Sequence, residues 1–188
     1  MPAGATYGKA AFNTSSQNNL KLYTFVDNHD TGSTQQHWEL KWENVPLAYT
    51  FILTHPGFPC VAWQHYFSED KDFRAGIQKW QYRGSEIISG TDKTFREHID
   101  YLIDLRKSVG IEYDDSVTVL ASTATNYAAK ITGTSGEIVV KIGGDSWSPS
   151  GTGYAGNYPI YSGTNFAIWQ KGNAGVEPVK VKVVLSAT

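Results

Sequence analysis

The sequence predicts an α/β segment with parallel strands followed by an all-β antiparallel sheet, and the change falls near Gly110. Before Gly110, short apolar strand-like runs alternate with helical patterns, and this β-α-β-α order is typical of parallel sheets. After Gly110, short β-prone segments are separated by turns rich in Gly, Ser, Thr and Asn, which favours antiparallel pairing. A length of 188 residues corresponds to one or two domains and is enough to bury a hydrophobic core.

The first predicted strand is Leu20–Val26, and it follows a loop-like stretch over residues 1–19 that is rich in Gly, Ala, Ser and Asn. The strand lacks clean alternation, which fits a strand covered on both faces. Residues 44–54 predict a helix, with Asn44 as its cap and Pro46 in the first turn, where a missing N–H costs nothing. Most of this helix is apolar, so we expect neighbouring elements to cover it.

The second predicted strand is Phe58–Trp63. Residues 68–93 have no strong period and predict a long loop, with a short helix near Ala75–Tyr82. Residues 94–97, Thr-Phe-Arg-Glu, form a capping-box signature, and Gly110 suits the position just after the end of the helix that this box begins.

Five short β-prone segments are predicted in the remaining chain, and the last contains the alternating run Val-Lys-Val-Lys-Val. They are Val117–Ala121, Tyr127–Ile131, Ile138–Ile142, Asn165–Gln170 and Val179–Leu185. No internal repeat is visible.

Composition and charge exclude several classes of function. The formal net charge of -2 argues against a basic nucleic-acid-binding surface. Cys60 is the single cysteine, so neither an intrachain disulfide nor a cysteine zinc cluster can form. No apolar run approaches the roughly 18 residues of a membrane span. The first residues do not resemble a signal peptide. We therefore expect neither nucleic acid nor membrane as a partner.

The motif Asp27-Asn28-His29-Asp30 places two carboxylates, an amide and an imidazole at the C-terminal end of the first predicted strand. In parallel α/β folds this is where ligands bind. The alternative is a polar turn whose side chains satisfy backbone groups, because such short motifs also occur by chance. A metal site is less favoured, since His29 and Asp30 are adjacent and the sequence shows no partner ligands.

The longer motif over residues 25–35 resembles the fourth conserved region of the α-amylase family, family thirteen of the glycoside hydrolases, in its plant-type form. The similarity continues, with gaps, from about residue 20 to 171. Ala48–Val61 is similar to the seventh helix and eighth strand of the family's barrel, Leu105–Lys107 to the end of its eighth helix, and Val139–Gly143 and Phe166–Trp169 to strands of its C-terminal domain.

The resemblance implies the C-terminal part of a TIM barrel, with strands seven and eight and their helices, followed by an antiparallel β-sheet domain. The implied domains are residues 1–110 for the last two βα units, with an insertion at 68–93, and residues 111–171 for the sheet. Residues 172–188 are a tail or the start of a further module.

The resemblance also implies retaining endo-hydrolysis of α-1,4-glucosidic bonds in starch or glycogen. The third catalytic carboxylate of the family maps onto Asp30, as the transition-state stabiliser, and His29 maps onto an imidazole that binds the same sugar. Gln35 and Trp38 correspond to cleft-lining positions, although Trp38 equally fits a role in covering a helix. His65 follows strand eight and is a candidate sugar contact. In the same motif Asp27 and Asn28 are expected to brace the turn.

The family's nucleophile, general acid/base and calcium ligands correspond to no part of this chain. Retaining hydrolysis needs two carboxylates about 5–5.5 Å apart across the scissile bond, and Asp27 and Asp30 flank one turn of one strand. An eight-stranded barrel needs roughly 250 residues. We therefore expect a C-terminal fragment that is inactive alone. Two alternatives are a non-catalytic glucan-binding protein and one subunit of a split amylase completed by a separate N-terminal barrel segment. The family suggests a secreted protein without deciding its compartment.

Overall fold

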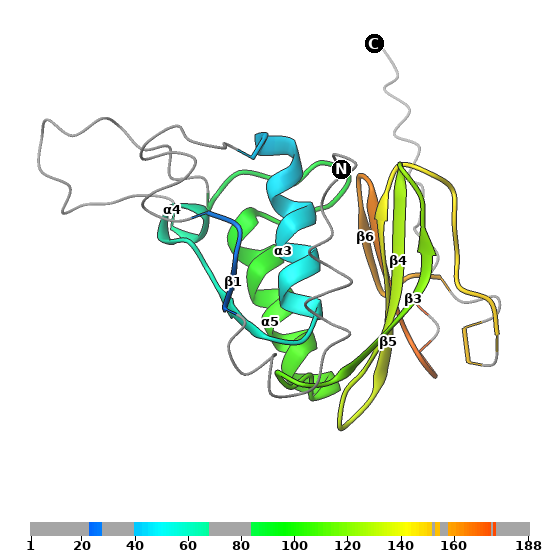
Figure 1. Cartoon of the computed structure of the whole chain (residues 1–188). Helices are drawn as coiled ribbons and strands as arrows, with labels where there is room; N and C mark the ends of the chain where they lie inside the picture. Colours follow the sequence, from blue (N-terminus) through cyan, green and yellow to red (C-terminus); the bar gives the residue numbers. More distant parts are fainter. Residues whose placement is uncertain are drawn as a thin grey trace, which may run out of the picture.

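The computed structural model describes residues 23–27, 40–67, 84–151, 153–154, 158–173 and 175. These residues form three layers, in which a pair of helices lies between a two-stranded parallel sheet and a five-stranded antiparallel sheet (Figure 1). The predicted order of a parallel α/β segment followed by an antiparallel sheet is therefore confirmed.

The parallel sheet consists of β1 (Tyr23–Phe25) and β2 (Phe58–Cys60), and its register places Phe25 beside Cys60. Both strands were expected from their apolar runs, and residues 20–22 of the first prediction lie outside the described residues. Because the strands are parallel, their C-terminal ends lie at the same edge of the sheet. This edge is where the candidate site is found.

The helix α3 (Val45–Thr54) is preceded directly by the 3₁₀ turn η1 (Trp42–Asn44). Pro46 occupies the first turn, as predicted, but the prediction that Asn44 caps the helix is wrong. Asn44 has helical dihedral angles, φ -96° and ψ -10°, and its side chain makes no capping bond. The physical reason is that η1 continues into α3, so that Asn44 is already part of the helical turn.

The helix α5 (Phe95–Val109) begins and ends as its sequence predicts. Thr94 accepts a hydrogen bond from the N–H of Glu97, and the Glu97 carboxylate accepts the N–H of Thr94 over 2.8 Å. Gly110 follows with φ 70° and ψ 45°, the left-handed conformation that glycine adopts without a steric penalty. These two signals fix the ends of the helix from local sequence.

Arg106 of α5 closes the C-terminal end of α3. Its guanidinium donates to the carbonyl of Leu53 over 3.3 Å, of His55 over 2.6 Å and of Gly57 over 2.9 Å. Carbonyl groups at a helix C-terminus have no partner within the helix, and a cation is favourable there. Arg106 therefore joins the two helices and supports the turn that leads into β2.

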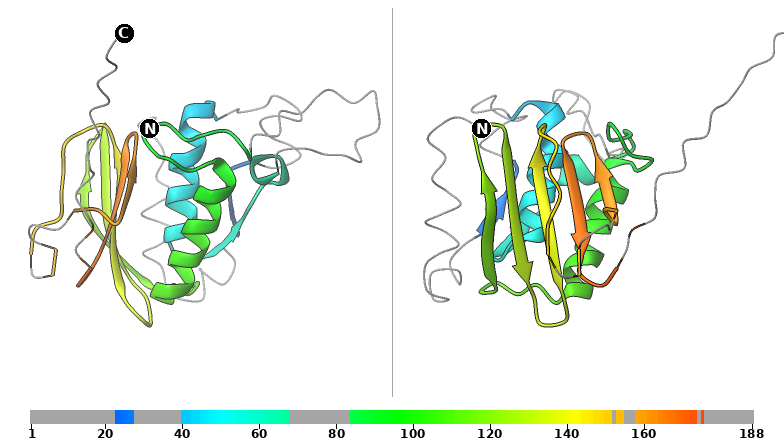
Figure 2. Two further views of the ribbon diagram at one scale, coloured as in Figure 1. Left: turned by 180° about the vertical axis from the view of Figure 1, so that it is seen from behind. Right: turned by 90° about the vertical axis from the view of Figure 1, so that its right-hand side faces the viewer.

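The antiparallel sheet has the strand order β3-β4-β5-β7-β6, and Figure 2 shows it face-on with the helices behind it. Four of its strands were predicted, and the fifth, β6, has only three residues, too few to give a periodic pattern. The one-turn helix α4 (Trp63–Tyr66), which follows β2, was not predicted for the same reason. The predicted segments Ala75–Tyr82 and Val179–Leu185 lie outside the described residues. The strands are β3 (Ser116–Ser122), β4 (Asn126–Thr132), β5 (Glu137–Gly143), β6 (Tyr161–Gly163) and β7 (Phe166–Gln170).

One continuous hydrophobic core lies between the helix pair and the inner face of the antiparallel sheet. Every second residue of β5 faces this core, as the period of a strand requires. The core unites buried side chains of both layers, among them Tyr49, Leu53, Ile99, Leu102, Ile131, Ile138, Val140 and Ile168. The domain boundary near residue 110 stays a prediction; the chain segments on either side of it bury side chains in the same core.

Candidate functional site

The predicted site residues fall into two groups. His29, Asp30, Gln35 and Trp38 lie outside the described residues, so their roles stay predictions. His65 is described, and the structure brings it to Asp27, the residue that begins the Asp-Asn-His-Asp motif. The Nε2 atom of His65 lies 3.8 Å from Oδ2 of Asp27, and the two side chains are 3% and 12% exposed.

The parallel register explains why these residues meet. Asp27 follows the end of β1, and His65 lies on α4, which follows the end of β2. The backbone pairing of the two strands stops at Phe25 and Cys60. Residues that come shortly after two neighbouring parallel strands share one edge of the sheet, and this is the usual place of a ligand site in α/β folds.

Tyr49 of α3 holds the other side of the His65 ring. Its hydroxyl accepts the N–H of Ala62 over 3.1 Å and lies 2.9 Å from Nδ1 of His65. Burial raises the pKa of Tyr49; the N–H of Ala62 opposes this rise, and the charge of Asp27 adds to it. Tyr49 is therefore protonated. A carboxylate only accepts, so the tautomer of a neutral His65 that suits both neighbours carries its proton on Nε2, which faces Asp27, and accepts from Tyr49 at Nδ1.

The aromatic surroundings fix the plane of this imidazole. The rings of Trp42 and Tyr49 both meet the His65 ring edge-on, at centroid distances of 5.2 and 5.6 Å. Trp42 in turn stacks on Phe95 of α5, with the ring centroids 4.8 Å apart. No sequence pattern indicates the parts played by Trp42 and Tyr49, because they reach the site through tertiary packing. The contact of His65 with substrate stays a prediction.

Two other histidines are buried where the helices meet the sheet, and both are structural. His55 approaches an α3 carbonyl with Nδ1 and the hydroxyl of Tyr127 with Nε2, each over 2.8 Å. His98 approaches an α3 carbonyl with Nε2 over 3.1 Å and the hydroxyl of Tyr161 with Nδ1 over 2.8 Å. A carbonyl only accepts, so each ring donates to the helix and accepts from a sheet tyrosine.

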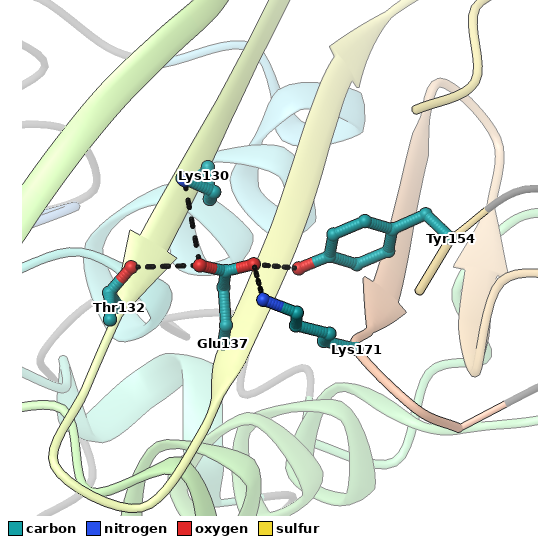
Figure 3. A network of polar contacts seen from close by, with 5 residues as sticks. All are labelled: Lys130, Thr132, Glu137, Tyr154 and Lys171. Carbon is teal, nitrogen blue, oxygen red and sulfur yellow. Dashed lines mark hydrogen bonds and ion pairs between the residues drawn. The ribbon is translucent and has the colours of Figure 1, made fainter. Parts of the chain in front are cut away.

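The outer face of the antiparallel sheet carries a polar network around Glu137 (Figure 3). Its carboxylate accepts hydrogen bonds from Thr132 over 3.2 Å and Tyr154 over 3.0 Å. The ammonium groups of Lys130 and Lys171 lie 3.5 and 3.4 Å from it. Partial burial alone would raise the pKa of Glu137. The hydrogen bond from Tyr154 and the charges of Lys130 and Lys171 outweigh this effect and hold the pKa below its usual value. The network fastens the segments around Tyr154 and Lys171 to the sheet.

Within the described ranges, no three His, Cys, Asp or Glu side chains come close enough together to hold a metal ion. The same part of the chain holds no helix long and apolar enough to cross a membrane.

The family model and the relatives found by comparison with known proteins agree with one another. Residues 108–170 match the family model of the alpha-amylase C-terminal beta-sheet domain. The probable alpha-amylase 2 of Arabidopsis thaliana is 38% identical over 80% of this chain, which spans 30% of that protein. The alpha-amylase type B isozyme of Hordeum vulgare is 31% identical, and the match covers 80% of each chain.

A solved structure is similar in fold as well. The crystal structure of an Anoxybacillus alpha-amylase aligns with 94% of this chain and 43% of its own, at a TM-score of 0.50 and 18% identity. At this identity the similarity concerns the fold alone. The described helices, parallel strands and five-stranded sheet match the C-terminal part of that structure.

Proposed function

Because this chain belongs to the α-amylase family, we propose that it is the C-terminal portion of an enzyme that hydrolyses α-1,4-glucosidic bonds in starch and glycogen with retention. The observation that carries the proposal is the match to the Hordeum vulgare alpha-amylase, which extends over 80% of both chains. The substrates are α-glucans, including malto-oligosaccharides.

In this proposal Asp30 is the catalytic residue that the chain contributes. A carboxylate beside the ring hydroxyls at the cleaved bond accepts hydrogen bonds that strengthen as the oxocarbenium ion develops, so it stabilises the transition state more than the ground state. His29, Gln35 and Trp38 are the proposed sugar contacts. His65 was predicted with them, but its side chain is only 3% exposed beside Asp27, which favours a role within the protein. The position of Asp27 supports the role proposed for Asp30, because it lies three residues before Asp30 at the shared edge of β1 and β2.

The nucleophile, the general acid/base and the calcium ligands belong, in this proposal, to a barrel segment outside the chain. Exposed aromatic side chains on the parallel sheet support such a segment: Tyr23 is 68% exposed and Phe25 is 49% exposed. Large apolar side chains gathered on a short parallel pair are typical of a surface that another element covers. The same observation favours the second candidate, a subunit of a split amylase whose barrel is completed by a separate polypeptide.

We expect the chain alone to release no reducing sugar from soluble starch. Co-expressed with the part of the Arabidopsis relative that precedes the region of similarity, it is expected to form a complex that hydrolyses starch. Reducing-sugar assays on the chain, the partner segment and the complex test this. Hydrolysis by the chain alone, lost in Asp30→Ala, would contradict the proposed incompleteness. Binding of the chain to immobilised starch, with no hydrolysis by the complex, would favour a non-catalytic glucan-binding protein.

A further inference from the structure

The contact between Asp27 and His65 joins the two strands beyond the end of their backbone pairing. The β1–β2 ladder has three residue pairs and stops at Phe25 and Cys60. Past that point, Nε2 of His65 lies 3.8 Å from the carboxylate of Asp27, with both side chains largely buried. Three residue pairs supply few backbone hydrogen bonds, so side-chain contacts help to fix the points where the chain leaves β1 and β2.

We propose that His65 is a positioning residue, which acts through Asp27 to fix the point where the chain leaves β1 and enters the segment that carries Asp30. The role differs from the direct sugar contact considered above, because His65 here acts on the protein and not on the substrate. The proposal rests on the proposed function, in which Asp30 is the residue that acts on the sugar.

His65 is suited to this role because its own position is fixed from several sides. The Tyr49 hydroxyl holds Nδ1 and is itself held by the N–H of Ala62. The Trp42 and Tyr49 rings meet the imidazole edge-on and come from η1 and α3, two elements outside the parallel sheet. The ring is therefore fixed relative to the helical layer. Its contact with Asp27 in turn fixes the end of β1 relative to that layer.

At 3.8 Å from Oδ2 of Asp27, Nε2 of His65 is beyond hydrogen-bond distance, so the attraction between the two groups is electrostatic. Because a carboxylate only accepts, the tautomer of a neutral ring that suits both neighbours carries its proton on Nε2, facing Asp27, and accepts from Tyr49 at Nδ1. A carboxylate that is only 12% exposed loses much of its hydration, so a nearby N–H or imidazolium stabilises it. The charge of Asp27 is also felt at Tyr49, where it contributes to the raised pKa.

Two matched variants of His65 separate this contact from packing. Asparagine places its amide near the position of Nδ1 and keeps the Tyr49 contact, whereas glutamine reaches the position of Nε2 and keeps the Asp27 contact. In the full chain, we expect His65→Asn to accelerate amide hydrogen exchange over residues 25–27 by at least about tenfold, through local opening. We expect His65→Gln to change it by less than about threefold, with α5 and β5 unchanged in both variants.

Asp27→Asn provides the same test from the other partner and should also accelerate exchange over residues 25–27. Unchanged exchange there in both His65→Asn and Asp27→Asn would overturn the proposal. An equal acceleration across residues 25–27, α5 and β5 would also overturn it, because that pattern indicates a general packing role.

Activity of the complex described above gives a second readout. There His65→Asn should lower kcat by about 10-fold to 100-fold with KM nearly unchanged, as expected when a transition-state group is misplaced. Rescue of kcat by His65→Gln would support positioning. A raised KM with unchanged kcat would overturn it in favour of direct sugar binding. If the wild-type complex hydrolyses nothing, the proposed function fails, while the exchange result still decides whether His65 holds the end of β1.

Discussion

Lowering the pH from 7.5 to 5 is expected to reduce the free energy of unfolding of this chain by about 4 kcal/mol, through His55 and His98 together. Burial is the main cause that lowers the pKa of both imidazoles from 6.5 to about 4. The nearby cations Arg106 and Lys93 add to this effect, and the hydrogen bonds to α3 carbonyls oppose it.

The sign follows from where the protons bind. In the unfolded chain each histidine takes up a proton near pH 6.5, whereas in the folded chain it stays neutral down to about pH 4. Their contribution to stability is therefore complete above pH 6.5 and is lost as the pH falls toward 4. Urea unfolding monitored by circular dichroism at pH 7.5, 6.5, 5.5 and 5 measures the change while most carboxylates remain charged.

Two kinds of variant assign the pH dependence to these rings. His55→Gln and His98→Gln should each remove about half of the slope between pH 7.5 and 5, because the new side chains do not titrate. Tyr127→Phe removes the hydroxyl that bonds His55 but keeps the buried ring, so it should lower stability at every pH and keep the slope. A double glutamine variant with the full wild-type slope would contradict the explanation.

Leu102→Ala is expected to cost about 3 kcal/mol of unfolding free energy. Leu102 is fully buried in the core that α5 shares with the antiparallel sheet, so its truncation leaves a cavity between the two layers. Since both layers use this core, helix loss followed by circular dichroism and sheet opening followed by amide hydrogen exchange in β5 should shift together. Urea titration with both probes measures the shift.

Leu120→Ala makes the same chemical change on the surface and serves as the control. Leu120 lies on β3 and is 44% exposed, so its truncation should alter stability by no more than about 0.5 kcal/mol. Two separate transitions in Leu102→Ala, with the sheet signal unmoved, would show that the helices and the sheet do not depend on one core.

The elements that sequence predicts well are those whose signals are local. The capping box at Thr94 and the glycine at 110 fix both ends of α5, and each works through bonds made within a few residues. The strands β4 and β5 are recognised as β-prone segments bounded by residues that favour turns. Asn44 shows the limit of such reasoning, because a good capping residue loses that role when a 3₁₀ turn precedes the helix.

The candidate site is less accessible to sequence reasoning. The Asp-Asn-His-Asp motif identifies one side of it, since those residues are contiguous. The other side is assembled by packing: Tyr49 is 16 positions from His65 in sequence and meets it through a buried hydrogen bond. His55 and His98 show the same limit, because their tyrosine partners lie 72 and 63 positions away. Nothing in the local sequence of a histidine indicates a hydroxyl partner on a distant strand.

We propose that Asp30 is a catalytic carboxylate that this chain supplies to an α-glucan hydrolase. The most direct measurement is the rate of starch hydrolysis by the complex of the full chain with the preceding segment of its Arabidopsis relative, with and without Asp30→Asn. The substitution is expected to lower kcat by at least about 100-fold, with unchanged assembly of the complex by gel filtration. An Asp30→Asn complex that assembles and hydrolyses starch at the wild-type rate would contradict it.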